Sequence, residues 1–137
     1  MPTASSAALR RAIYDALLAD AALTALLGGP HIYDEPPRQP TFPYVTLGEA
    51  RVTNFSAGET RAEEHQLALH AWSRHGGHRE AHLISGALLQ ALDDAPLSLA
   101  EHHLVNLRFA TADVRREPDG RTYHATVRFR AVTEPAA

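Results

Sequence analysis

The chain has 137 residues, of which 45% are hydrophobic, and it carries a formal net charge of −3. This length suits one compact domain and leaves no room for a second, while the lack of a basic excess disfavours a general nucleic-acid binder. Cysteine is absent, so disulfides, thiolate zinc sites and cysteine nucleophiles are excluded. We expect a single domain over residues 1–137, with residues 1–5 and 134–137 loosely attached.

The sequence contains no segment typical of secretion or membrane insertion. Its first residues, MPTASS, lack a basic region followed by an apolar one, and no apolar run approaches the roughly 18 residues needed to cross a bilayer. These features predict a soluble protein that is made in the cytoplasm and does not bind membranes.

The first predicted element is a long helix. Apolar residues recur at helical spacing over residues 9–27, after a serine N-cap at Ser5 or Ser6 and before the Gly28-Gly29 break. Asp20 is placed to cap a second short helix, which would divide the segment in two. Residues 31–43 follow with a short candidate strand at 32–33 and then four prolines, which predict an extended connector.

A hairpin and a second helix come next. Residues 44–54 and 61–73 are predicted strands joined by a polar tip. In the second strand, Leu67, Leu69 and Ala71 alternate with polar or aromatic residues, which is typical of a strand with one buried face. Beyond Gly76-Gly77, apolar residues at helical spacing over 81–92 predict a helix with one buried stripe.

The C-terminal third is predicted to form a second hairpin. Strands over residues 103–116 and 121–133 are separated by a Pro-Asp-Gly turn at 118–120. We expect Val105, Leu107 and Phe109 to share one face of the first strand. In the second strand, alternate residues from 123 to 131 are apolar and face the core. The order of elements predicts an α+β domain in which two helices pack on one face of a mostly antiparallel sheet of two hairpins.

Nine histidines are many for this length, and three of them cluster at 75, 78 and 82. His78 and His82 would lie one helical turn apart, a spacing that can chelate zinc or nickel, although the sequence fixes no carboxylate or fourth ligand for them. A metal-dependent enzyme built on this cluster is one hypothesis. The alternative is a group of exposed histidines at an element boundary, with no metal and no cofactor.

No other catalytic arrangement is apparent. The sequence has neither a Gly-x-Ser-x-Gly elbow nor a phosphate-binding glycine loop. Glu63 and Glu64 are adjacent on a strand, so their carboxylates point to opposite faces and cannot act on one bond. We therefore predict a protein without catalytic residues.

Two surfaces are candidates for contacts with other proteins. Arg128 and Arg130 alternate on the last strand and are expected to join Arg108 across the sheet in a positive strip, unless neighbouring carboxylates neutralise them. The tip of the first hairpin is polar with an apolar residue at its base, which suits a projecting contact loop as well as a mobile end. Its candidate contact residues are Phe55, Ser56, Glu59, Thr60 and Arg61.

Several short segments, spread over nearly the whole chain, point to one family. They are residues 12–17, 20–29, 32–34, 42–45, 47–49, 65–74, 118–120 and 127–131. The sequences of these segments resemble those of the tail completion proteins of long-tailed phages, also called tail terminators or tail-to-head joining proteins. Such proteins occur in siphophages, prophages and gene transfer agents.

The resemblance implies a structural virion protein assembled in the host cytoplasm. Members of such a family form a homo-hexameric ring that caps the tail tube, ends its polymerisation and joins the tail to the head connector. The implied partners are the tail tube protein and the connector, and DNA passes through the ring without specific binding. A subunit of the head–tail connector, or neck, is the near alternative.

Overall fold

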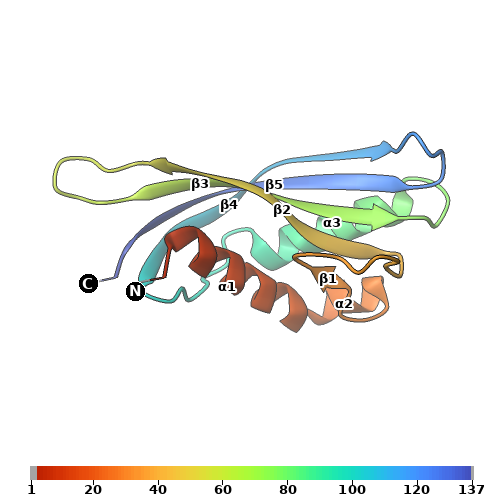
Figure 1. Cartoon of the computed structure of the whole chain (residues 1–137), viewed down its shortest axis with the longest axis horizontal. Coiled ribbons are helices and arrows are strands. Elements are labelled where there is room, and N and C mark those ends of the chain that lie inside the picture. Colours follow the sequence, from red (N-terminus) through yellow and green to blue (C-terminus); the bar gives the residue numbers. More distant parts are fainter. Residues whose placement is uncertain (1–2, 137) are drawn as a thin grey trace.

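The computed structural model describes residues 3–136, which form two layers (Figure 1). One layer is a five-stranded sheet and the other consists of helices. The elements are α1 (Ser5–Ala19), α2 (Ala21–Leu27), β1 (Ile32–Tyr33), β2 (Tyr44–Asn54), β3 (Glu63–Ser73), α3 (Arg79–Leu92), β4 (His102–Arg116) and β5 (Tyr123–Pro135). The predicted α+β class is confirmed.

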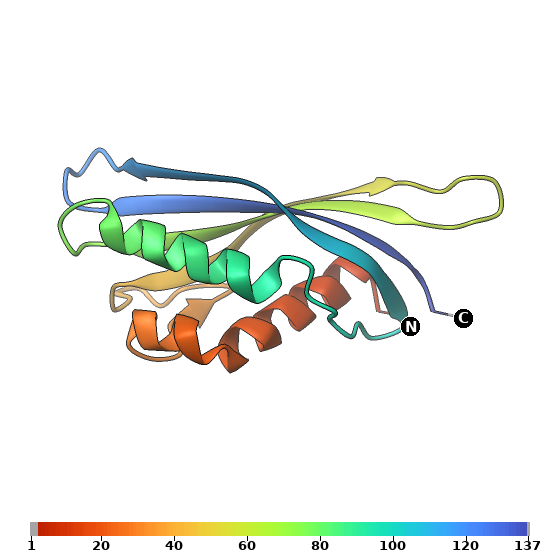
Figure 2. The ribbon, with the colours of Figure 1, turned by 180° about the vertical axis from the view of Figure 1, so that it is seen from behind.

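The sheet has the strand order β1-β2-β3-β5-β4. The β2–β3 and β4–β5 hairpins predicted from the sequence are both present, and the antiparallel pairing of β3 with β5 joins them into one surface. The short β1 adds to β2 in parallel. Figure 2 shows all three helices on the same side of this sheet, so its other face is not covered by helices.

The core lies between the helices and the inward face of the sheet. Leu69, Val127 and Phe129 belong to the same buried cluster as Leu17 of α1 and Leu88 of α3, as the alternating pattern predicts. Phe129 is 1% exposed and meets Phe109 of β4 edge to face, with ring centroids 6.2 Å apart. Hydrophobic burial at this cluster therefore fixes which face of β5 carries the helices.

The long N-terminal helix is divided at Asp20, as the sequence suggests. The backbone of Asp20 is extended, and its Oδ1 accepts the N–H of Leu23 at 2.9 Å. This side chain satisfies one of the backbone donors that the start of α2 leaves without an intrahelical partner. Gly28 then ends α2 in the left-handed conformation at φ 77°.

Removing this cap should destabilise the domain measurably. We expect Asp20→Ala to lower the free energy of unfolding by about 1 kcal/mol, since an N-cap side chain typically contributes that much. Urea denaturation followed by circular dichroism measures the change. The control is Asp15→Ala, which removes only an exposed pair with Arg11 and should shift the free energy by less than about 0.5 kcal/mol. Equal losses in the two variants would contradict the capping role.

The two ends of the chain contact each other through Glu101. The backbone N–H of Thr3 donates to its carboxylate at 2.7 Å, and the N–H of Ala136 donates to its carbonyl oxygen at 3.2 Å. Ser5 is buried in the first turn of α1, and β5 extends to Pro135. The expected looseness of residues 1–5 and 134–137 stays a prediction; residues 1, 2 and 137 lie outside the described part.

The first part of β4 departs from simple alternation. Leu104 pairs with Thr133 and Asn106 with Val132, so Val105 is an extra residue in a bulge and is 48% exposed. Val105 is thus exposed whereas Leu107, with which it was expected to share one face, is buried, so this part of the prediction is wrong. A bulge inserts one residue and shifts the phase of the side chains, and in an edge strand it also hinders pairing with other chains.

Candidate functional site

The β2–β3 hairpin extends well past the helices as an arm (Figure 1). We call residues 55–62, which connect the paired ends of β2 and β3, the arm tip. The last pair of the two strands is Asn54 with Glu63. Beyond it the tip lies past the ends of the helices in Figures 1 and 2, and its residues are mostly exposed. The arm therefore presents a long surface that the domain itself does not cover.

The arm tip has a defined local structure. The N–H of Phe55 donates to the carbonyl of Ala62 at 2.9 Å, and Ala57 and Thr60 exchange two backbone hydrogen bonds of the same length. Ser56 receives a further bond from the N–H of Ala62 on its hydroxyl oxygen at 3.1 Å. These hydrogen bonds hold the backbone of the tip in a tight turn, from which its polar side chains project.

The base of the arm brings together the two candidate surfaces that the sequence suggests separately. Phe55 is 51% exposed, and the guanidinium of Arg130 lies 5.3 Å from the centre of its ring. Arg130 also donates to Glu64 of β3 at 2.6 Å. A cation over an aromatic face is attracted by the ring's negative potential. The arm and the arginine strip thus form one continuous surface.

The predicted arginine strip is present on the face without helices. Arg108 lies directly opposite Arg130 on the paired strands, and Arg128 lies one position further along the same face of β5. Each guanidinium has a carboxylate nearby: Arg130 with Glu64 at 2.6 Å, Arg128 with Glu49 at 3.5 Å, and Arg108 with Asp93 at 3.5 Å. The strip is therefore largely neutralised, which disfavours tight binding of phosphate.

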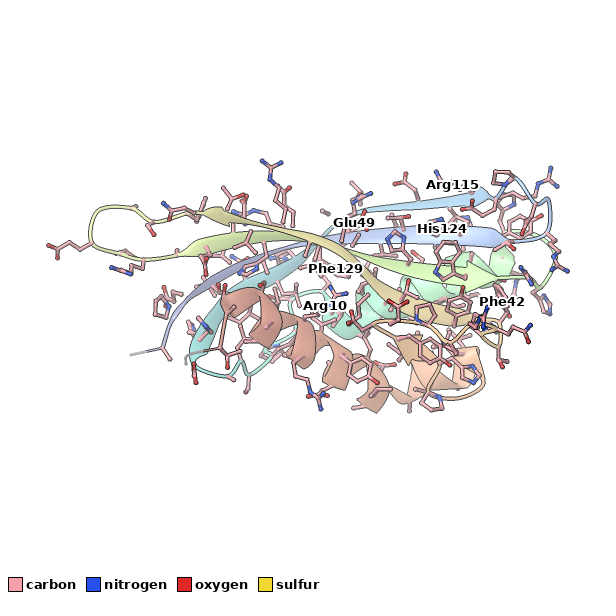
Figure 3. All side chains as sticks on the ribbon, viewed as in Figure 1. Arg10, Phe42, Glu49, Arg115, His124 and Phe129 are labelled. Atoms are coloured by element: carbon pink, nitrogen blue, oxygen red, sulfur yellow. The ribbon has the colours of Figure 1, made fainter. Side chains whose placement is uncertain are left out.

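A row of rings at the other end of the same face was not predicted. Tyr44, Trp72 and His124 are neighbours across β2, β3 and β5. Trp72 stacks on His124 with ring centroids 3.9 Å apart, and Tyr44 stacks on Trp72 at 6.2 Å. Figure 3 shows His124 and Phe42 in this half of the sheet, away from the arm. The alternation indicated which face these residues occupy, but the strand register was needed to align them.

A chain of hydrogen bonds runs beside this row. Glu49 contacts Nε2 of His70 at 2.8 Å, His70 Nδ1 lies 2.7 Å from His124 Nε2, and His124 Nδ1 contacts Glu117 at 2.7 Å. The hydrogen bond from His70, with smaller contributions from Glu49's own backbone and Arg128, lowers the pKa of Glu49 to about 2. Two histidines 54 residues apart are thus joined in one chain of contacts, and their local sequences gave no signal of it.

Gly48, in one of the segments that resemble the family, controls the position of the His70 ring in this chain of bonds. A Cβ at Gly48 would lie 2.5 Å from the His70 ring and 2.9 Å from the carbonyl oxygen of Ala68. The β2–β3 register shifts between Leu47 and Ala50, which places the glycine against His70. A residue with a side chain at position 48 would therefore displace the imidazole that Glu49 contacts.

A hollow lies between α1 and the strands β2 and β3. It has a volume of about 420 Å³ and is lined mostly by apolar residues of these three elements. Arg10, labelled in Figure 3, lies on its border and donates to the backbone oxygens of Leu47 and Gly48 at 2.9 Å. Arg10 also pairs with Asp34. These bonds attach α1 to the edge of the sheet.

The histidine cluster at 75, 78 and 82 does not form the metal site considered above. His78 lies just before α3, with its ring edge-on to Tyr123 at 4.8 Å. Within residues 3–136, no group of three or more histidine, aspartate or glutamate side chains is placed to hold a metal ion. Nor does this part of the chain contain a helix long and apolar enough to span a bilayer.

Comparisons with known proteins agree with the resemblance seen in the sequence. The tail completion protein gp17 family matches residues 11–134. The chain is 29% identical over 101 residues to tail completion protein gp17 of Bacillus phage SPP1, a match that covers 72% of this chain and 73% of the phage protein.

A solved structure gives a closer match in shape. A chain from the virion of a native gene transfer agent particle superposes with a TM-score of 0.89 and 32% sequence identity, covering 96% of this chain and 98% of that one. Both the fold and the order of the elements are therefore shared along almost the full length. The chain belongs to the tail completion protein gp17 family and is a structural component of a phage or phage-like tail.

Proposed function

We propose that six copies of this protein form a ring that caps the tail tube, ends its polymerisation and joins the tail to the head connector. The observation that carries this proposal is the TM-score of 0.89 over 96% of the chain with a protein of a gene transfer agent virion. A family match over residues 11–134 supports the same role. The function is mechanical and needs no catalytic residues.

The arm supports a role in contacts between subunits. It carries the half-exposed ring of Phe55 and a polar tip on two strands that reach past the body of the domain. An apolar anchor with a polar rim is the usual composition of a protein interface. We propose that Phe55, Ser56, Glu59, Thr60 and Arg61 contact the tail tube or an adjacent subunit, with Arg108, Arg128 and Arg130 extending the same surface.

A ring suits a domain of this size because closed symmetry repeats one contact around the axis. Each contact between two small domains can be weak, and the closed assembly is still stable. The free protein is accordingly expected to be monomeric at low concentration. Passing DNA would meet a protein of net charge −3 whose strip arginines are paired with carboxylates, so phosphates would not be held tightly.

A reconstruction of the particle by electron cryomicroscopy tests the ring directly. We expect six copies at the head-proximal end of the tail, in contact with the last ring of the tube. Three, five or twelve copies would contradict the stoichiometry. A ring attached to the head and separated from the tube by another protein would instead identify a neck subunit.

A further inference from the structure

The contact between His70 and His124 cannot be formed by two neutral imidazoles with the partners they have. A carboxylate only accepts hydrogen bonds, so Nε2 of His70 carries a proton toward Glu49, and Nδ1 of His124 carries one toward Glu117. In neutral rings the remaining nitrogens, His70 Nδ1 and His124 Nε2, would both be lone-pair acceptors. They lie 2.7 Å apart.

A third proton resolves this conflict. Placed between the two facing nitrogens, it makes one imidazole a donor and the other an acceptor, and all three hydrogen bonds are then satisfied. Thr126 does not replace it, because its hydroxyl oxygen is 3.4 Å from each of the two nitrogens and has one proton to give. We infer that the His70–His124 pair is a proton-binding site, which holds one extra proton and one positive charge in the folded protein.

On the β2 side, the charges around the pair favour the extra proton. The carboxylate of Glu49 contacts His70 directly, and Arg128 of β5 lies 3.5 Å from the same carboxylate. Because the carboxylate of Glu49 contacts the imidazole directly at 2.8 Å, its negative charge favours the protonated ring at this end. The low pKa of Glu49 keeps that charge in place across the neutral range.

The β4 side has a similar balance. Glu117 contacts His124, Arg115 pairs with Glu117 at 3.4 Å, and Asp113 lies opposite Thr126 across the β4–β5 ladder. Burial, the largest influence, lowers the pKa of His124, although the hydrogen bond to Glu117 opposes this shift. His124 is therefore favoured as the neutral acceptor of the two facing rings, which opposes a second extra proton on the pair.

The surrounding rings stabilise the shared charge. Trp72 stacks on His124 at 3.9 Å with an interplanar angle of 12°, and the face of an indole attracts a cation. Gly48 leaves the space that His70 occupies. The pair therefore lies between an aromatic face and two carboxylates, and the inferred proton is shared between the two facing nitrogens.

Nuclear magnetic resonance of the purified full chain tests the inference. Long-range proton–nitrogen correlations on a ¹⁵N-labelled sample report the protonation of each ring nitrogen. At pH 7 we expect three protonated nitrogens over the pair, and a scalar coupling between His70 Nδ1 and His124 Nε2 across the shared hydrogen bond. Two protonated nitrogens, or four, would overturn the inference.

A second measurement uses stability. In the unfolded chain, the two histidines together carry on average one extra proton near pH 6.5. They lose it at higher pH and gain a second one at lower pH, while the folded pair keeps one extra proton throughout. The pair's contribution to stability is therefore greatest near pH 6.5 and is lost as pH rises above that value or falls below it. The unfolding equilibrium constant should change by up to about tenfold per pH unit on each side.

The comparison requires matched variants. The double variant His70→Gln/His124→Gln lacks the titrating pair, so subtracting its urea-unfolding profile between pH 5 and 9 from that of the parent should leave a maximum near pH 6.5. The control is His75→Gln/His103→Gln, which removes two exposed histidines and should retain the parent profile. A flat or monotonic difference would overturn the inference, and the resonance measurement on the parent decides the matter if the double variant does not fold.

Discussion

Replacing Phe129 with alanine is expected to lower the free energy of unfolding by about 3 to 5 kcal/mol. Its ring is 1% exposed and lies in the cluster that joins the sheet to α1 and α3. The substitution removes buried apolar surface and leaves a cavity that the neighbours, Leu67 across the β3 ladder and Phe109 across the β4 ladder, cannot fully close. A loss of this size is a large share of the stability of a small domain.

Urea denaturation of the two purified proteins measures the change, and the chain supplies a matched control. Phe55→Ala removes the same side chain at a position that is 51% exposed, outside the core. We expect that variant to lose less than about 1 kcal/mol, mainly from its contact with Arg130. If Phe129→Ala lost as little as Phe55→Ala, the inward face of β5 would be wrongly assigned.

Shortening the arm should abolish joining without unfolding the domain. Replacing residues 55–62 with Asn-Gly connects Asn54 to Glu63, the last paired residues of β2 and β3, through a turn that suits a hairpin. Almost all of the deleted side chains are exposed, and β3 stays paired with β5 along its whole length. The midpoint of thermal unfolding should therefore remain within a few degrees of the parent.

The functional effect is expected in the particle. Electron microscopy of particles assembled with the shortened protein should show overlong tails or heads without tails, because the surface that meets the tube or the neighbouring subunit is missing. Arg121→Ala, at the exposed turn between β4 and β5, serves as a control and should assemble normally. Tails of normal length with full infectivity or gene transfer would place the joining surface elsewhere, with the strip of Arg108, Arg128 and Arg130 as the next candidate.

The secondary structure was largely readable from the sequence because each element carries a local signal. Helical spacing and the cap at Asp20 identified α1 and α2, and the two-glycine break preceded α3. Period-two alternation identified the inward faces of β3 and β5, which hydrophobic burial then enforces. The family was also apparent from the sequence, since the residues that resemble it lie in these same local segments.

The tertiary structure decided what depends on register and on contacts between distant segments. The bulge that exposes Val105 is set by how β4 pairs with β5, and no local pattern specifies it. The same holds for the carboxylates that neutralise the arginine strip. His70 and His124 meet only because β3 and β5 are neighbours in the sheet, although 54 residues separate them in the chain. Local propensities determine the elements of this protein, whereas its charge network arises from strand order, which is a property of the whole fold.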